Sequence, residues 1–165
     1  MDAVNLEDIR RRHIWLMRTT AKTIGHFLQG ISHEDATQLR DGENGWTVLE
    51  VICHLRDFDG FFRHRAQMML AQDCPELPAY DHEAIAIERR YNEGNLQDAY
   101  AELLASRHET VDLFKQLTPE QWVRTGIHPE RGLFTMLDAV IQVGFHDSDH
   151  LEQMTRIMIE GVRKA

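Results

Sequence analysis

The chain has 165 residues, with 18 basic and 27 acidic side chains and a formal net charge of -9. This length fits a single domain spanning residues 1–165, which would bury about 68–70% of the surface of the unfolded chain. Nucleic acid is an unfavourable partner because phosphate binding needs clustered lysine and arginine, and the sequence has no basic stripe. It also has no apolar run long enough to cross a membrane, no secretory signal pattern and only two cysteines, so we expect a cytoplasmic protein.

Apolar residues recur with helical spacing in four long stretches, and each stretch follows a residue type that caps helices. These stretches predict helices over residues 6–29, 47–71, 95–117 and 135–160. Asn5 and Asn95 precede the first and third helices. Thr47 with Glu50 forms the pattern of a capping box at the second helix, and the fourth helix begins at Thr135.

The connection between the second and third predicted helices is much longer than a bundle turn requires. It has about twenty residues, includes Pro75 and Pro78, and could return the chain from one end of a bundle to the other. No alternating apolar run is long enough to predict a strand. The sequence therefore predicts an all-α four-helix bundle with one long crossover between helices two and three.

His146 and His150 are the first candidates for a functional site. Residues four apart lie on the same face of a helix, so two imidazoles at this spacing can reach one divalent ion at about 2.0–2.1 Å. Two histidines leave such a site incomplete, because catalytic zinc sites use three protein ligands and keep one position for water. A water or a thiol at that position would lose a proton more easily and become a nucleophile.

His54, in the second helix, is the best candidate for the third ligand. Glu50 and Asp57 lie one turn before and three residues after it, where a carboxylate could orient the second ring nitrogen. Taken alone, His54 is better explained as a core or surface histidine with its hydrogen bonds satisfied. The other histidines, among them His64 and His82, fall in polar surroundings or near helix ends.

Four segments of the chain resemble the DinB/YfiT-like family, and in particular its YfiT-like branch. The segments, in the order and spacing of that family, are Gly45–Asp57 (GWTVLEVICHLRD), Pro78–Asp81 (PAYD), His128–Gly132 (HPERG) and His146–Gln153 (HDSDHLEQ). The resemblance implies a four-helix bundle with up-down-down-up topology. It also implies that His54, His146 and His150 bind one divalent metal ion.

The resemblance defines the metal site more closely than it defines the reaction. Some relatives are transferases or isomerases that use a low-molecular-weight thiol as co-substrate, and YfiT-like members are described as metal-dependent hydrolases. A metal-dependent enzyme acting on a small molecule is therefore the leading hypothesis, and a non-catalytic metal-binding or stress-response protein is the alternative. Three imidazoles suit zinc or nickel first, with iron and manganese as further candidates.

Further residues are candidates for the pocket or for contacts that orient the ligands, although none is identified as catalytic. They are Glu50, Asp57, Tyr80, Asp81, Asp147 and Gln153. Asp147 falls close to the apolar stripe of the fourth helix, where a carboxylate needs a partner. Gln153 lies one turn beyond His150, and Tyr80 and Asp81 in the crossover could cover the site as the resemblance suggests.

A homodimer is expected from the resemblance and from apolar residues outside the four core stripes. These residues are Trp15, Phe61 and Phe145. Exposed apolar patches of this kind mark interfaces between proteins.

Overall fold

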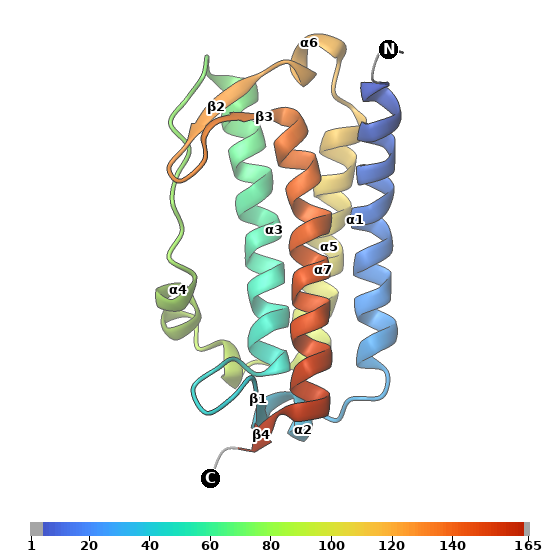
Figure 1. Cartoon of the computed structure of the whole chain (residues 1–165), viewed down its shortest axis with the longest axis vertical. Helices are drawn as coiled ribbons and strands as arrows, with labels where there is room; N and C mark the ends of the chain where they lie inside the picture. The colour runs from blue at the N-terminus through green and yellow to red at the C-terminus, as the bar shows by residue number, and fades with distance from the viewer. Residues whose placement is uncertain (1–4, 164–165) are drawn as a thin grey trace.

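The computed structural model describes residues 5–163, and four long helices make up its body (Figure 1). These helices are α1 (Leu6–Leu28), α3 (Val48–Ala71), α5 (Leu96–Lys115) and α7 (Met136–Glu160). Each predicted helix is present, with bounds within two residues of the prediction. The predicted four-helix bundle is therefore confirmed.

The starts of the long helices follow the predicted capping chemistry. Asn5 accepts a hydrogen bond from the backbone of Asp8, and Asn95 accepts two from the first turn of α5. Reciprocal capping boxes begin α3 at Thr47 and α7 at Thr135. These contacts satisfy backbone N–H groups that the first turn of a helix leaves without an internal partner.

The helices run in the order up, down, down, up. In Figure 1, α1 and α7 point one way and α3 and α5 the other, and each helix packs against two neighbours. Because α3 and α5 are parallel, the chain returns along the whole bundle between them. This crossover contains α4 (His82–Glu88) and the short 3₁₀ helix η1 (Tyr91–Glu93), and it passes outside α3.

Short elements close the ends of the bundle and include strands that the sequence did not predict. These elements are α2 (His33–Gln38), α6 (Pro119–Trp122), β1 (Leu39–Arg40), β2 (Thr125–His128), β3 (Gly132–Thr135) and β4 (Val162–Arg163). The prediction that the chain has no strands was therefore wrong for these short segments at the ends of the bundle. Strands of two to four residues are too short to show alternation. The β2–β3 hairpin turns where Gly132 adopts a φ of 70°, and β1 pairs with β4 from the far end of the chain.

The core consists of two apolar clusters separated by a charged network at mid-bundle. The network joins all four long helices. Each helix contributes one central residue, which lies along the chain between the residues that this helix adds to the two clusters. These residues are Thr20, Asp59, Arg107 and Asp147. The Arg107 guanidinium donates to Asp59 Oδ1 at 2.5 Å and to both oxygens of Asp147 at 2.6 and 2.9 Å. Thr20 donates to Asp147, so a single buried network joins all four helices.

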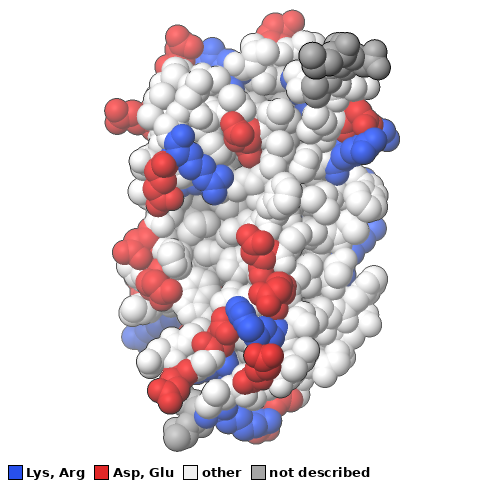
Figure 2. Space-filling model, in the orientation of Figure 1, with Lys and Arg blue, Asp and Glu red and all other residues white. Residues whose placement is uncertain are grey.

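The surface reflects the acidic composition. Figure 2 shows acidic side chains over much of the face that presents α3 and α7, with basic side chains set among them. Within residues 5–163, no helix combines the length and the apolar character needed to cross a membrane.

Candidate metal centre

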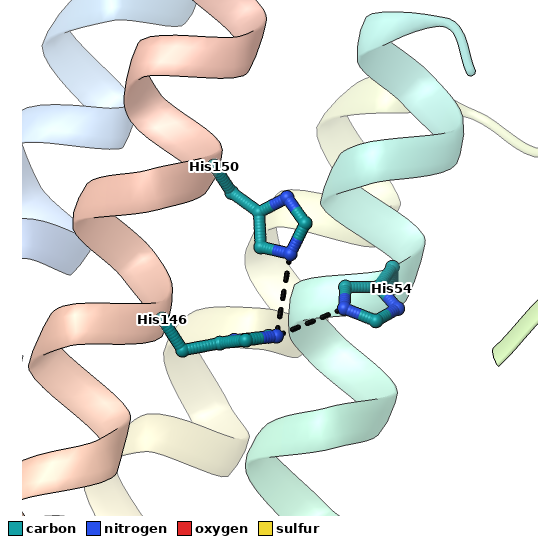
Figure 3. A group of neighbouring side chains, drawn as sticks. All are labelled: His54, His146 and His150. Carbon is teal, nitrogen blue, oxygen red and sulfur yellow. Dashed lines mark hydrogen bonds between the residues drawn. The ribbon is translucent and has the colours of Figure 1, made fainter. Parts of the chain in front are cut away.

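Three histidines from two neighbouring helices point toward one another (Figure 3). His54 comes from α3, and His146 and His150 come from successive turns of α7. The Nε2 atom of His146 lies 3.0 Å from His54 Nε2 and 3.2 Å from His150 Nε2. The candidate ligand atoms of the three rings all lie within 4.8 Å of one another.

The spacing of these nitrogens fits a shared metal ion. Two nitrogens bound to one ion at about 2.0–2.1 Å are separated by about 2.9–3.4 Å for ligand angles between octahedral and tetrahedral. A neutral imidazole carries one N–H group, so His146 Nε2 cannot donate to both of its neighbours at once. A cation among the three nitrogens would satisfy all of them.

The protonation of the three rings also suits metal binding. Burial lowers the pKa of His54, and the neighbouring rings of His146 and His150 lower it further. Burial likewise lowers the pKa of His146 and of His150. The rings are therefore neutral at pH 7, which is the form that binds a metal ion.

Gln153 fixes the orientation of His150. The Nδ1–H group of His150 donates to Gln153 Oε1 at 2.8 Å, which leaves the lone pair of Nε2 facing the other histidines. Gln153 Nε2 in turn donates to Asp41 Oδ2 at 3.2 Å, and Arg156 donates to the same oxygen at 3.1 Å. This chain of contacts defines both the tautomer and the position of one candidate ligand.

His54 is positioned by packing, and the two carboxylates proposed to orient it have other partners. Its ring stacks on Phe58 with centroids 4.1 Å apart, and its buried Nδ1 has no hydrogen-bond partner among the described residues. Glu50 accepts from the backbone of Thr47, because it completes the capping box of α3. Asp57 accepts from Arg56, Arg89 and Tyr91. The interpretation that Glu50 and Asp57 orient His54 was therefore wrong.

The histidines open onto a pocket of about 400 Å³. Besides the three rings, its lining residues are Asn44, Gly45, Trp46, Phe58, His82, Glu83 and Gln153. The indole of Trp46 lies 4.9 Å from the His54 ring and donates to Glu83 at 3.2 Å, which links the loop before α3 to α4. The outer wall of the pocket is thus built from two connecting segments, and the inner wall from α3 and α7.

Three other proposed pocket residues lie elsewhere. Tyr80 stacks on Phe61 at 3.9 Å between ring centroids and does not line the pocket. Asp81 is the N-cap of α4, so its carboxylate accepts from Ala84 in its own turn. Asp147 points into the bundle and binds Arg107, because successive residues of α7 face different sides of the helix. The crossover does cover the site, but through His82 and Glu83, which follow Asp81.

Trp46 and His82 line the pocket, although neither was among the predicted site residues. Trp46 lies directly before the capping residue Thr47, so its position followed from the predicted start of the helix. The signal for His82 was weaker: Asp81 is a capping residue type, and recognising it would have predicted a short helix whose first residue is His82. Cys53, directly before His54, is buried, and burial raises the pKa of its thiol to about 11.

Comparison with known families agrees with this fold. The model of the DinB superfamily matches residues 2–154, so the chain belongs to that superfamily. Two similar proteins are provisionally named metal-dependent hydrolases. OB0413 of Oceanobacillus iheyensis is 24% identical over 152 residues, which cover 91% of this chain and 85% of that protein. YfiT of Bacillus subtilis is 26% identical over 122 residues, which cover 73% of this chain and 67% of YfiT.

Two solved structures share the fold. YfiT from Bacillus subtilis, described as having an unusual four-helix bundle topology, superposes with a TM-score of 0.83 at 21% identity. That match covers 95% of this chain and 89% of YfiT. The mycothiol-dependent maleylpyruvate isomerase gives a TM-score of 0.72 at 13% identity and covers 88% of this chain and 60% of the isomerase.

Proposed function

We propose that the protein is a divalent-metal-dependent enzyme that acts on a small molecule, with His54, His146 and His150 as the metal ligands. The observation that carries this proposal is that three neutral imidazoles converge on one point at the inner wall of a pocket of about 400 Å³. Pockets of about 300–1,000 Å³ are typical of small-molecule sites. Of the candidate metals, zinc and nickel suit three nitrogen ligands best, followed by iron and manganese.

In this proposal the metal ion, the residues that orient the histidines and the residues of the pocket wall have different roles. A bound divalent ion would supply positive charge that lowers the pKa of a water or thiol coordinated to it. Gln153 holds His150 in the tautomer that ligates, and Phe58 packs against His54 and His146. Trp46, His82 and Glu83 form the part of the wall that a substrate would contact before it reaches the histidines.

Two reaction classes are supported by the relatives. OB0413 and YfiT are provisionally named metal-dependent hydrolases, and a protein of the same fold is an isomerase that depends on mycothiol. Hydrolysis is our first candidate because the hydrolase relatives are the ones found by sequence. Transfer to a low-molecular-weight thiol is the second.

One experiment separates these reactions. Protein loaded with zinc or with nickel is offered activated esters and amides alone, and then electrophiles with a panel of low-molecular-weight thiols. Hydrolysis predicts turnover without thiol, and transfer predicts turnover only when thiol is present. His150→Ala should lose the activity, whereas the surface variant His64→Ala should keep it.

Activity that survives complete removal of the metal would overturn both reactions. The alternative is a non-catalytic metal-binding protein. It predicts full metal content without turnover of any substrate class in the panel. It also predicts that substitution of Trp46 or His82 leaves every measured property unchanged.

We also propose a homodimer that uses the outer face of α7. Phe145 is 57% exposed and Ile159 is 75% exposed, and their spacing of 14 residues places them on similar sides of the helix. Phe61, one of the residues that suggested a dimer, stacks on Tyr80 within the chain. Light scattering should give twice the mass of 19.2 kDa for the native protein and the monomer mass for Phe145→Glu. A monomer mass for the native protein at micromolar concentrations would contradict the dimer.

A further inference from the structure

A second and larger cavity lies at the other side of the molecule, in the groove that α1 forms with the end of α5 and with α6. Its volume is about 820 Å³, and it shares no lining residue with the pocket of the metal centre. Its lining residues are Glu7, Arg10, Arg11, Arg12, Ile14, Trp15, Arg18, Phe114, Lys115, Leu117, Pro119 and Trp122. In Figure 1 the start of α1 and α6 lie together at one end of the bundle.

The charge of this groove is opposite to that of the whole chain. Five of its lining residues are arginine or lysine and one is acidic, in a protein with a formal net charge of -9. Asp8 pairs with Arg11 and Arg12. Arg10, Arg18 and Lys115 have no carboxylate within 4.0 Å among residues 5–163. In Figure 2 basic side chains appear along the edge of the molecule that α1 forms.

The groove also offers flat apolar surfaces beside these cations. Phe114 and Trp122 are buried in its floor, with their rings stacked 6.0 Å apart. The guanidinium of Arg10 lies 4.6 Å from the centroid of the Trp122 ring. The indole of Trp15 is 62% exposed at the edge of the groove. Exposed tryptophan beside unpaired cations favours a ligand that has both an aromatic surface and a negative charge.

We propose that this groove binds a small organic anion with a flat aromatic body, such as an aromatic carboxylate or sulfonate. Arg10, Arg18 and Lys115 would pair with the anion, and the indole of Trp15 would stack on the ring. A bare phosphate or sulfate would leave the indole unused. A second copy related by a two-fold axis through the groove would bring the same five cations against one another, which is unfavourable.

The proposal can be tested with a matched pair of fluorescent probes. The aromatic sulfonate 8-anilino-1-naphthalenesulfonate carries the charge, and N-phenyl-1-naphthylamine is its neutral counterpart. The sulfonate should bind one site per chain and at least about 5-fold more tightly than the neutral probe, because partly exposed charge pairs contribute modestly to affinity. Equal affinities for the two probes would overturn the proposal.

Variants locate the binding site. Arg18→Gln and Lys115→Gln, each made as a single variant, should raise the dissociation constant of the sulfonate by about 3-fold or more, and Trp15→Ala should weaken both probes. Lys22→Gln is the matched control, since it removes one positive charge from α1 at a residue that does not line the groove. Circular dichroism establishes that each variant is folded. An equal loss of affinity in Lys22→Gln would show that overall charge governs binding and would refute a built site.

Two further measurements distinguish this groove from the other proposed surfaces. Saturating zinc should leave the dissociation constant of the sulfonate unchanged, whereas competition would place the probe at the metal centre and overturn the proposal. Trp15→Ala should leave the mass in light scattering unchanged. Conversion of a dimer to a monomer by Trp15→Ala would instead show that a second copy covers the groove.

Discussion

His146 lies at the centre of the histidine cluster, because its Nε2 atom is close to the Nε2 atoms of both other rings. His54 and His150 each approach it from one side. A metal ion held by three nitrogens in this arrangement depends on each of them, since loss of one leaves two ligands and a much weaker site.

Replacement of His150 by Ala should therefore remove most of the bound metal. Metal content per chain, measured by elemental analysis after purification without an affinity tag, should fall from near one to well below one half. His64→Ala is the control, because His64 is an exposed residue of α3 outside the cluster. Equal metal content in the two variants would refute the assignment of the ligands.

The lowered pKa values of the histidines predict how the stability of the metal-free protein depends on pH. Burial lowers the pKa of His54 in the folded state, whereas the unfolded chain has the ordinary value of about 6.5. The unfolded chain therefore binds the proton more readily as the pH falls below that value. Stability is fully present above about pH 6.5 and is lost as the pH falls below it.

The free energy of unfolding, measured by urea titration in the presence of a chelator, should fall between pH 7.5 and pH 5.5. A histidine that stays neutral in the folded state contributes about 1 kcal/mol to this fall. His54→Phe removes one such group and should reduce the fall by about that amount. A pH dependence in His54→Phe equal to that of the native protein would contradict neutral burial of His54.

At the scale of elements, the first turn of α3 holds both the end of the crossover and part of the pocket wall. Thr47 accepts from the backbone of Glu50 and donates to Asn92 at 2.7 Å, so the cap also holds the end of the crossover. Trp46, the residue before the cap, forms part of the pocket wall. The start of this helix thus positions the crossover and the pocket together.

Thr47→Ala should lower the free energy of unfolding by about 1 kcal/mol or more, since it removes a helix cap and the contact with Asn92. The matched variant Thr118→Ala removes the cap of α6, a helix of only 4 residues, and should have a smaller effect. Urea titration compares the two. A larger loss in Thr118→Ala would show that the start of α3 does not have this role.

The sequence was sufficient to predict the four long helices and the shared face of His146 and His150, because both depend on spacing within one helix. His54 lies on another helix, and its place in the cluster was implied by the family resemblance. Capping residues such as Thr47 and Asn95 defined the helix starts without tertiary information. The β2–β3 hairpin was missed because its four-residue strands show no alternation. The partner of Asp147 could not be predicted, since Arg107 lies 40 residues away and on another helix. The roles of Trp46 and His82 depend on the path of the crossover, which helical periodicity does not reveal.

At the scale of the whole molecule, the charged network is the connection common to all four long helices. Arg107 is almost fully buried and lies between two buried carboxylates, those of Asp59 and Asp147. Removal of its positive charge would leave Asp147 without an ion pair and Asp59 with only the longer pair to Arg63 at 3.5 Å, which costs more than the ion pairs of Arg107 contribute.

Arg107→Met should lower the free energy of unfolding by about 3–5 kcal/mol. Arg156→Met is the control, because Arg156 is 37% exposed and its pair with Asp41 contributes about 1 kcal/mol or less. If Arg107→Met does not fold, the triple variant Asp59→Leu, Arg107→Met, Asp147→Leu should recover a folded state, because it leaves no uncompensated charge. A stable Arg107→Met protein would show that the network is not needed for the bundle.

Because α3 and α5 are parallel, the segment that joins them is a place where substrate selectivity can evolve. A bundle of strictly alternating helices needs only short turns, whereas this topology requires a return segment along its full length. That segment contributes His82 and Glu83 to the pocket and contributes none of the three clustered histidines. Mutations of His82 and Glu83 can alter which molecules fit while the histidine cluster remains intact, whereas Leu77 in the same segment belongs to the core. Directed evolution of new selectivity should therefore begin with a library at residues 82 and 83.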